Sequence, residues 1–390
     1  MQELSPHPLK TLTNSHTDTA VSAFQRFNQN QLERLRESWR DIVRSGYHAE
    51  PFFQPEWLTS YALAFNEQSE ISAITTSRGR ELLGILPVQY QKTFFGRVPA
   101  HTLRSLSGIH SCRFDLIHKH DERQSVVEST WHTLRSTMPW VVIELLDVPV
   151  DGSAHDLLKL ARQDGCVVGT WPTRKMPFMS FPRGQPNPFS RCPTDSRVYR
   201  TRLNTKLRKL RALGEVVLKV YPPEDRLALE HFIHLEGKGW KGRAGGAISA
   251  TKRAPQFYDL ISRAAAERGY LRFHSLELNN EPISMQFGLL MNGHYYAPKV
   301  AYDERYAMYS PGQLLVKLVI EELSKRGSHT YDFMGPRAPW KSVWTADTRE
   351  HHNLYIFRPT LEGRALHALT LKLGARARKI KHQVFGDPQA

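Results

Sequence analysis

The amino-acid sequence predicts an α+β protein with α/β-type layers, arranged as two modules. The chain has 390 residues, which is too long for one ordinary domain and suits two domains of roughly 150 to 200 residues each. Strand-like and helix-like patterns alternate along both halves. A stretch with five prolines, from residue 176 to residue 193, is the best candidate for a connection between the modules. We therefore expect a boundary near residue 190.

The N-terminal half shows helix and strand patterns in alternation. A helix is predicted over about 27–44, and a turn at 52–57 leads into a second helix. The short strand-like runs lie at 71–76, 82–90, 114–117 and 141–146, and further helical patterns lie at 121–137 and 154–164. These elements suffice for a sheet covered by helices.

The C-terminal half has clearer boundaries between its elements. Its predicted helices lie at 195–211, 222–234, 255–267 and 311–326, and its predicted strands at 216–221, 271–278, 283–291, 294–302 and 329–334. Tight turns connect the three middle strands, so we expect an antiparallel meander. A Gly-rich loop at 237–246 is expected to act as a flexible lid over a substrate, with a solvated loop as the alternative.

Composition and motifs exclude several protein classes. With 40% hydrophobic and 23% charged residues, the composition is that of a globular protein. The longest apolar run, from Trp140 to Ile143, is far shorter than the roughly 20 residues that cross a bilayer. No secretory signal is visible at the start of the chain, so we expect a cytoplasmic protein. Neither the 3 cysteines nor the 18 histidines have metal-site spacing, so no metal is predicted.

The net charge of +15 is concentrated in two segments. Residues 195–211 hold seven Lys and Arg against one Asp, a net +6, and residues 361–390 hold six against two acidic residues, a net +4. The first segment has apolar residues at helical spacing, which predicts an amphipathic helix with a cationic outer face. That face could bind phosphate or nucleic acid, or it could simply be solvated. The tail could pack on the domain or lie on an anionic membrane surface.

The start of the helix predicted at 311–326 has the features of an anion site. Ser310 fits the N-cap, Pro311 the first helical position, and Gln313 the third position of a capping box. Gly312 adds no side chain that would block a ligand. Free backbone amides and the positive end of the helix dipole favour a phosphate here. The alternative is a well-capped helix that binds nothing.

The order of elements and motifs over residues 195–345 resembles the acyl-donor-binding core of the GNAT acyltransferases. More closely, it resembles the branch named after the cellulose-biosynthesis protein CelD, also called BcsL, which is related to the FemAB peptidoglycan aminoacyltransferases. The matching features are the basic helix before Leu210-Arg211-Ala212-Leu213-Gly214, the segment Glu236-Gly237-Lys238-Gly239-Trp240-Lys241-Gly242, Phe257-Tyr258, Tyr302-Asp303, Ser310-Pro311-Gly312, Tyr331-Asp332-Phe333 and Trp340-Lys341. Each feature is weak alone, whereas their joint order is fairly specific.

This resemblance implies two tandem GNAT-like modules, each with a mixed, mostly antiparallel central sheet flanked by helices. The implied parts are a flexible tail (1–22), an N-terminal GNAT-like domain (23–185), a Pro-rich connection (186–196), a C-terminal acyltransferase domain (197–360) and a basic helix or tail (361–390). The resemblance also implies acetyl-CoA or another acyl-CoA as the donor. Residues 307–312 keep only the last glycine of the usual pyrophosphate loop, so aminoacyl-tRNA and an acyl carrier protein are alternative donors.

The candidate site residues come from these motifs and from the chemistry of acyl transfer to an amine. This reaction needs a proton acceptor and hydrogen-bond donors to the carbonyl oxygen. The candidates are Asp332, Lys341 and Glu236 for catalysis, Tyr309, Ser310, Gly312 and Gln313 for donor binding, and Trp240, Lys241, Arg243, Gln286 and Tyr302 for substrate binding. The alternative for Asp332 is a turn-capping carboxylate, and for Lys341 an ordinary surface lysine.

Together these features predict an N-acyltransferase that moves an acyl group, expected to be acetyl, from an acyl-CoA-type donor to an amine. Exopolysaccharide or cell-envelope biosynthesis is the expected context. The acceptor is expected to be a small-molecule amine or one linked to a glycan or lipid. Two alternatives remain: a FemAB-like aminoacyltransferase that uses aminoacyl-tRNA, and a non-catalytic binding protein of an envelope pathway.

Overall fold

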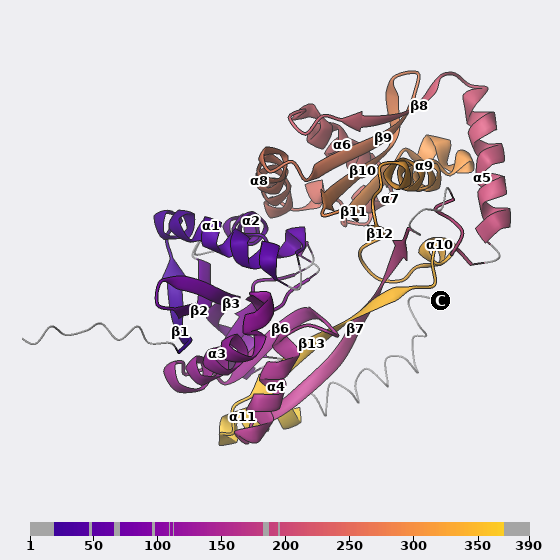
Figure 1. Ribbon diagram of the computed structural model, residues 1–390. Helices are drawn as coiled ribbons and strands as arrows, with labels where there is room; N and C mark the ends of the chain where they lie inside the picture. The colour runs from indigo at the N-terminus through magenta and orange to yellow at the C-terminus, as the bar shows by residue number, and fades with distance from the viewer. Residues whose placement is uncertain are drawn as a thin grey trace, which may run out of the picture.

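One mixed sheet runs through both halves of the protein in the computed structural model (Figure 1). The structure describes residues 19–46, 49–65, 71–95, 98–108, 110–111, 113–181, 187–193 and 196–369. The sequence-based expectations for residues 1–18 and 370–390 therefore lie outside the described residues. Within the described ranges, no helix combines the length and the apolar character needed to cross a membrane.

The N-terminal half contributes seven strands and four α-helices to the described structure. The strands are β1 (Val21–Phe27), β2 (Ile71–Arg78), β3 (Glu81–Phe95), β4 (Val98–Ser105), β5 (Ile117–His118), β6 (Val142–Pro149) and β7 (Val167–Ser180). The helices are α1 (Gln29–Ser45), α2 (Pro55–Phe65), α3 (Arg123–Thr137) and α4 (Ala154–Gln163).

The C-terminal half contributes the remaining elements. Its strands are β8 (Val216–Tyr221), β9 (Leu271–Leu278), β10 (Glu281–Met291), β11 (His294–Tyr302), β12 (Thr330–Asp332) and β13 (Thr348–Phe357). Its helices are α5 (Ser196–Arg211), α6 (Leu227–Lys238), α7 (Trp240–Arg243), α8 (Arg253–Glu267), α9 (Pro311–Lys325), α10 (Pro339–Ser342) and α11 (Leu361–His367).

The sheet has the strand order β1-β2-β3-β4-β6-β13-β7-β12-β11-β10-β9-β8, and β5 pairs with β3. Among these described pairs, only β4 with β6 and β11 with β12 are parallel. The predicted α+β fold class, with a mixed and mostly antiparallel sheet, is confirmed. The expected strand over 114–117 is replaced by the two-residue strand β5, with which it shares only Ile117. The helix expected over 222–234 begins later, at Leu227, and ends at Lys238.

Strands β7 and β13 join the two halves. β13 lies between β6 and β7 and is antiparallel to both. β7 pairs with β13 as far as Pro177 and then with β12 from Phe178 to Ser180. The sequence-based boundaries assign 348–357 to the C-terminal domain, whereas in the structure this last strand completes the N-terminal sheet. Strand partners this far apart in the sequence leave no local pattern, so the sequence does not reveal that residues 348–357 pair with strands of the N-terminal half.

Helices cover both faces of the C-terminal part of the sheet. Phe232 of α6 and Phe257 of α8 share a core with Phe287 of β10 on one face. Leu203 of α5 and Leu315 of α9 belong to the core on the other face. Helix α2 of the N-terminal half also packs on α8, so the two halves share a hydrophobic core. Burial of this shared apolar surface favours a fixed orientation of the halves.

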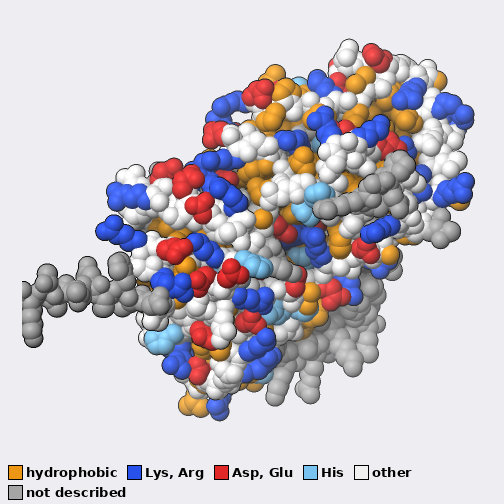
Figure 2. Space-filling model, viewed as in Figure 1, with side chains coloured by type: hydrophobic (Ala, Val, Ile, Leu, Met, Phe, Trp, Pro, Cys, Tyr) orange, Lys and Arg blue, Asp and Glu red, His pale blue; other side chains and the backbone are white. Residues whose placement is uncertain are grey.

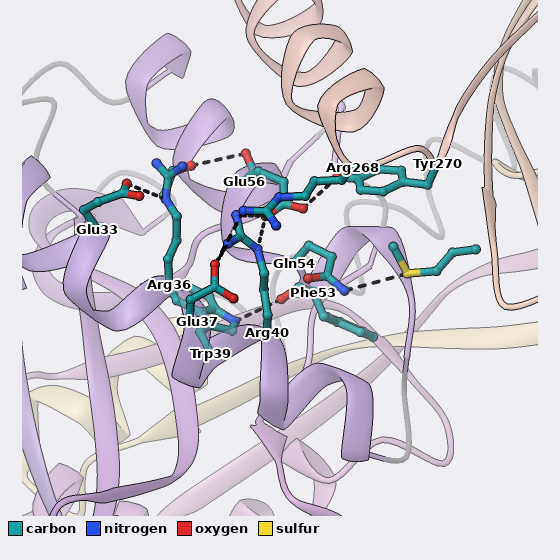
Figure 3. A network of polar contacts seen from close by, with 12 residues as sticks. Glu33, Arg36, Glu37, Trp39, Arg40, Phe53, Gln54, Glu56, Arg268 and Tyr270 are labelled. Atoms are coloured by element: carbon teal, nitrogen blue, oxygen red, sulfur yellow. Dashed lines mark hydrogen bonds and ion pairs between the residues drawn. The ribbon is translucent and has the colours of Figure 1, made fainter. Parts of the chain in front are cut away.

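A buried polar network adds to this interface (Figure 3). The carboxylate of Glu56 in α2 accepts hydrogen bonds from Arg40 of α1 at 3.4 and 3.3 Å and from the hydroxyl of Tyr270 at 3.1 Å. Burial, followed by the charge of Glu56, raises the pKa of Tyr270 well above its usual value. Since each buried group has a partner, the network fixes α1 and α2 against the C-terminal half.

The first turns of the predicted basic tail form a short helix on the domain. Leu366 of α11 packs with Phe357 and Val142 in a small apolar cluster, and the Thr360 hydroxyl caps the helix by accepting from the amide of Gly363 at 3.2 Å. Residues 361–367 therefore pack on the domain, which is one of the two arrangements expected for the tail.

Candidate functional site

The sheet opens between β11 and β12. These strands are paired over three residues only, from His294 opposite Thr330 to Tyr296 opposite Asp332. Beyond this point the amide of Phe333 donates to the carbonyl of Pro177, so the chain follows β7 and leaves β11. The edge of β11 from 297 to 302 is therefore not covered by β12.

A β-bulge in β11 lies at the start of this opening. Tyr296 pairs with Leu289 of β10 and Lys299 pairs with Phe287, so two residues of β11, Ala297 and Pro298, lie opposite one. A bulge re-aims the side chains that follow it, and proline cannot donate to a strand ladder. Here the side chain of Lys299 comes to lie near Glu236 of α6.

A cavity of about 620 Å³ occupies the opening. Its walls come from α6 and α7 on one face of the sheet, from the start of α9 on the other face, and from β11 and the turn at 333–336 between them. The cavity therefore passes through the sheet. Eight of the twelve predicted site residues line it, namely Glu236, Lys241, Gln286, Tyr302, Ser310, Gly312, Gln313 and Lys341.

The predicted capping box at the start of α9 is wrong. Ser310 has a left-handed backbone conformation (φ 54°, ψ 53°) and makes no side-chain cap, whereas an N-cap side chain reaches the helix amides from an extended backbone. Its hydroxyl instead accepts from Lys206 of α5 at 2.6 Å, and the side-chain oxygen of Gln313 accepts from Trp344 at 3.0 Å. The structure thus places a lysine ammonium at the positive end of the α9 dipole, which strengthens the preference for an anion.

Glu236 is the centre of a charged cluster on the α6 side of the cavity. One carboxylate oxygen accepts from the amide of Ile248 at 2.8 Å, and the other from Lys241 at 3.1 Å. Lys241 also donates to the carbonyl of Val300 at 2.7 Å, and burial lowers its pKa. The expected flexible lid is instead a folded turn containing α7, where a side chain at Gly242 would meet the carbonyl oxygen of Gly237.

Lys299 is a third charged group of this cluster, and sequence reasoning missed it. Its ammonium lies 3.8 Å from the Glu236 carboxylate and 5.8 Å from the centre of the Tyr258 ring. The available signal was a lysine inside the otherwise apolar strand pattern of 294–302, because buried charges need a partner or a function.

His110 belongs to the N-terminal half and contacts the same region. Its ring stacks on Phe65 at 5.2 Å, and its Nδ1 lies 3.4 Å from the Tyr258 hydroxyl. Burial, followed by the nearby Lys299 charge, lowers the pKa of His110 to about 4. The imidazole is therefore neutral at physiological pH.

A chain of buried hydrogen bonds leads to the cavity from the sheet core. The side-chain nitrogen of Gln286 donates to the Tyr331 hydroxyl at 2.5 Å, and the Tyr295 hydroxyl donates to the Gln286 oxygen at 3.2 Å. His274 contacts Tyr295 at 3.0 Å. With its oxygen accepting from Gln286, the Tyr331 hydroxyl retains a hydrogen to donate, and burial raises its pKa, so it stays protonated.

Asp332, expected to be a catalytic base, does not line the cavity. Its carboxylate forms a buried ion pair with Arg113 of the N-terminal half and accepts from the amide of Met334 at 2.9 Å. A guanidinium nitrogen of Arg349 lies 3.5 Å from the same carboxylate. A carboxylate with these partners holds the two halves together and does not face a substrate, so it is not retained as a base.

The other predicted residues take structural or peripheral positions. Lys341 donates to the carbonyls of Met334 and Pro336 and braces the turn at the cavity wall, where Met334 and Gly335 have positive φ. Arg243 is exposed and pairs with Glu304 at 2.8 Å. Like Asp332, the predicted residues Arg243 and Tyr309 are not among those that line the cavity. The Trp240 side chain lies outside the described part of the structure.

Within the described ranges, no group of three or more His, Cys, Asp and Glu side chains could hold a metal ion.

Comparison with known proteins agrees with this geometry. Residues 197–342 match the family model described as an acetyltransferase (GNAT) domain. A search of curated proteins gives no match. Among solved structures, FemX is 13% identical with a TM-score of 0.56, over 88% of this chain and 99% of FemX.

A second structure is similar over most of the chain. The C-terminal domain (DUF2156) of a "Putative Lysylphosphatidylglycerol Synthetase" from Agrobacterium fabrum is 9% identical with a TM-score of 0.51, over 92% of this chain and 99% of that domain. At these identities the likeness concerns the fold. Residues 197–342 thus form a GNAT-type N-acyltransferase domain, within a chain whose overall fold is similar to that of FemX.

Proposed function

We propose that the protein transfers an acyl group from an acyl-CoA-type thioester to an amine, and that donor and acceptor enter the cavity from opposite faces of the sheet. One observation carries this proposal. The cavity passes through the sheet beside the unpaired edge of β11, with the start of α9 at one end and Glu236 at the other. Two reactants can therefore meet inside the protein.

The α9 side suits the donor. The helix start and Lys206 supply positive potential for phosphate groups. Apart from the Val300 carbonyl, which accepts from Lys241, the edge of β11 that β12 leaves uncovered offers backbone groups to an extended, amide-containing chain. The side chains of Val316, Phe333 and Ala297 add an apolar wall. Acyl-CoA would supply an activated acyl group, whose transfer forms a C–N bond and breaks the C–S bond. The residues fit the phosphates and the chain of such a donor.

The α6 side suits the amine. Glu236 is the only carboxylate among the described residues that line the cavity. A carboxylate oxygen can accept more than one hydrogen bond, so Glu236 can receive the acceptor's ammonium group and then its proton. On the donor side of the reaction, the Tyr331 hydroxyl can donate to the acyl carbonyl oxygen, where negative charge develops.

The acceptor is proposed to be a small-molecule amine or an amine on a glycan or lipid precursor. The motif resemblance to the CelD branch supports a role in exopolysaccharide or cell-envelope biosynthesis. Transfer of acetyl, as opposed to a longer acyl group, rests on the same resemblance.

Donor binding is the direct experiment. Isothermal titration with coenzyme A, acetyl-CoA, longer acyl-CoAs and an acyl carrier protein should reveal binding by at least one of them. Gly312→Glu, which places a carboxylate at the start of α9, should abolish that binding. Ser136→Glu, on an exposed position of α3, is the matched charge control. Wild-type protein that binds none of the donors would remove the basis of the proposal.

An aminoacyl-tRNA donor is the second candidate, and helix α5 favours it. Five cations on this helix are exposed, and none takes part in an ion pair in the described structure: Arg197, Arg202, Arg208, Lys209 and Arg211. Figure 2 shows Lys and Arg side chains along this edge of the molecule. Because Lys206 of the same helix touches Ser310, an RNA on α5 would lie next to the donor end of the cavity.

Salt dependence distinguishes this candidate. Affinity for tRNA that falls steeply with salt, and falls further in Arg202→Glu/Arg208→Glu protein, supports it. Salt-insensitive or absent binding favours the acyl-CoA-type donor.

A further inference from the structure

Lys299 and Glu236 face each other across the acceptor side of the cavity without forming a hydrogen bond. Their charged atoms are 3.8 Å apart, and the side chains are 17% and 1% exposed. In the described structure the Lys299 ammonium makes no hydrogen bond; its neighbours are the Glu236 carboxylate and the Tyr258 ring. A partly buried ammonium whose nearest anionic oxygen lies 3.8 Å away can form stronger, charge-assisted hydrogen bonds to an anionic ligand.

The acceptor side has an excess of positive charge. Glu236 is shared between Lys241, at hydrogen-bonding distance, and the more distant Lys299. His110, whose pKa is lowered by burial and by the Lys299 charge, is neutral at physiological pH and adds no charge to this cluster. One carboxylate thus faces two ammonium groups in a partly buried site, and this excess repels a simple cationic amine while attracting an anionic group.

We infer that the acceptor is an amine that also carries a carboxylate or phosphate group, with its ammonium at Glu236 and its anionic group at Lys299. This inference rests on the proposed acyltransferase function and names the class of its substrate. Such a molecule would replace one long ion pair with two hydrogen-bonded ones, and it would place an anion beside Lys299 while its ammonium takes the place of Lys299 at Glu236. A diamine offers Lys299 no acceptor, and an amino sugar without a phosphate group offers it only uncharged hydroxyl oxygens.

Matched pairs of amines test the inference. Lysine and cadaverine differ by the carboxylate of lysine. Glucosamine 6-phosphate and glucosamine differ by the phosphate group. For each compound, binding to the donor-free protein and transfer from the donor that the titrations identify are both measured. In at least one pair, the anionic member should bind and react about tenfold better or more, which corresponds to about 1.4 kcal/mol.

Variants of Lys299 assign the effect to this residue. Lys299→Gln should remove the preference within the pair, Lys299→Arg should retain it, and Lys299→Glu should reverse it. Lys325→Gln, at the exposed end of α9, should behave as wild type. Circular dichroism and thermal unfolding confirm that each variant is folded.

The outcomes separate this inference from the proposed function. Equal or better use of the non-anionic members by wild-type protein overturns the inference and leaves the acyltransferase function standing. A preference for the anionic member that survives in Lys299→Glu protein also overturns the inference. The inference is likewise overturned if the donor binds normally but none of the amines binds or reacts. If no donor binds, the proposed function fails first and the inference fails with it.

Discussion

Arg113 and Asp332 form an ion pair that is almost completely buried between the two halves of the chain, with side chains 2% and 1% exposed. Arg113 also pairs with Glu50 in the N-terminal half. Asp332 ends β12, directly before the turn that leaves β11 and opens the cavity. The pair therefore connects the N-terminal half to the point where the reactive opening begins.

Replacement of Arg113 by Met should destabilise the protein strongly. Removing one partner of a buried pair leaves an uncompensated charge, which costs about 3–5 kcal/mol. The unfolding free energy from urea denaturation measures this loss. Arg44→Met, which removes an exposed pair with Asp41, should change it by less than about 1 kcal/mol. Similar effects of the two substitutions would contradict a joining role for Arg113.

Glu236→Gln should impair transfer without impairing donor binding. Loss of a positioned proton acceptor typically reduces the rate by about 10²–10⁴-fold, and the amide can still accept the hydrogen bond from Ile248. Steady-state kinetics with the best acceptor and titration with the donor measure the two effects separately. Glu230→Gln, on an exposed position of the same helix, is the control. Wild-type kcat in Glu236→Gln protein would exclude Glu236 as the proton acceptor.

Tyr331→Phe should weaken the hydrogen bond to the acyl carbonyl. The infrared band of bound ¹³C-carbonyl acetyl-CoA should lie at higher frequency in the variant, and the rate should fall by about 10²-fold. Tyr199→Phe, which alters a tyrosine that packs on Trp344 and does not line the cavity, should leave the band unchanged. An identical band in wild-type and Tyr331→Phe protein would place the carbonyl away from Tyr331.

Two histidines that are neutral in the folded protein should make stability fall in mild acid. Burial, followed by the Arg113 charge, lowers the pKa of His351 to about 3, and that of His110 is about 4. In the unfolded chain both take up protons near pH 6.5. The unfolded state then binds more protons than the folded state, so the unfolding free energy declines as the pH falls below about 6.5.

Denaturant titrations between about pH 7 and pH 5 check this dependence, since most carboxylates remain ionised over that range. The His351→Phe variant should show a smaller decline than wild type. A free energy of unfolding that stays constant across this range would mean that the two histidines are not held neutral.

Local patterns predicted the C-terminal elements well. The expected strands 216–221, 271–278 and 294–302 coincide with β8, β9 and β11, because turns and glycines mark their ends. Four strands were missed, namely β1, β4, β7 and β13. Prolines interrupt β7, and charged residues and histidines interrupt the beginning of β13. Their pairing depends on partners in the other half of the chain, which single-sequence patterns do not report.

The candidate site was predicted only in part, because local motifs are visible in the sequence whereas contacts between distant segments are not. Motifs identified the start of α9, Glu236 and Lys241, which the cavity brings together. The role of Asp332 was misjudged because Arg113, its partner, lies far away in the sequence. The capping box at Ser310 failed because the preceding 3₁₀ turn (Glu304–Tyr309) leads into α9 through a left-handed residue, which residue types alone do not reveal.

A crystal structure of the protein with bound coenzyme A would show whether the donor enters the opening in the sheet. We expect phosphate groups at Ser310 to Gln313 and an extended chain along the uncovered edge of β11, with its sulfur inside the opening between β11 and Phe333. Coenzyme A bound elsewhere, with β11 and the turn at 333–336 closed against each other, would contradict this expectation.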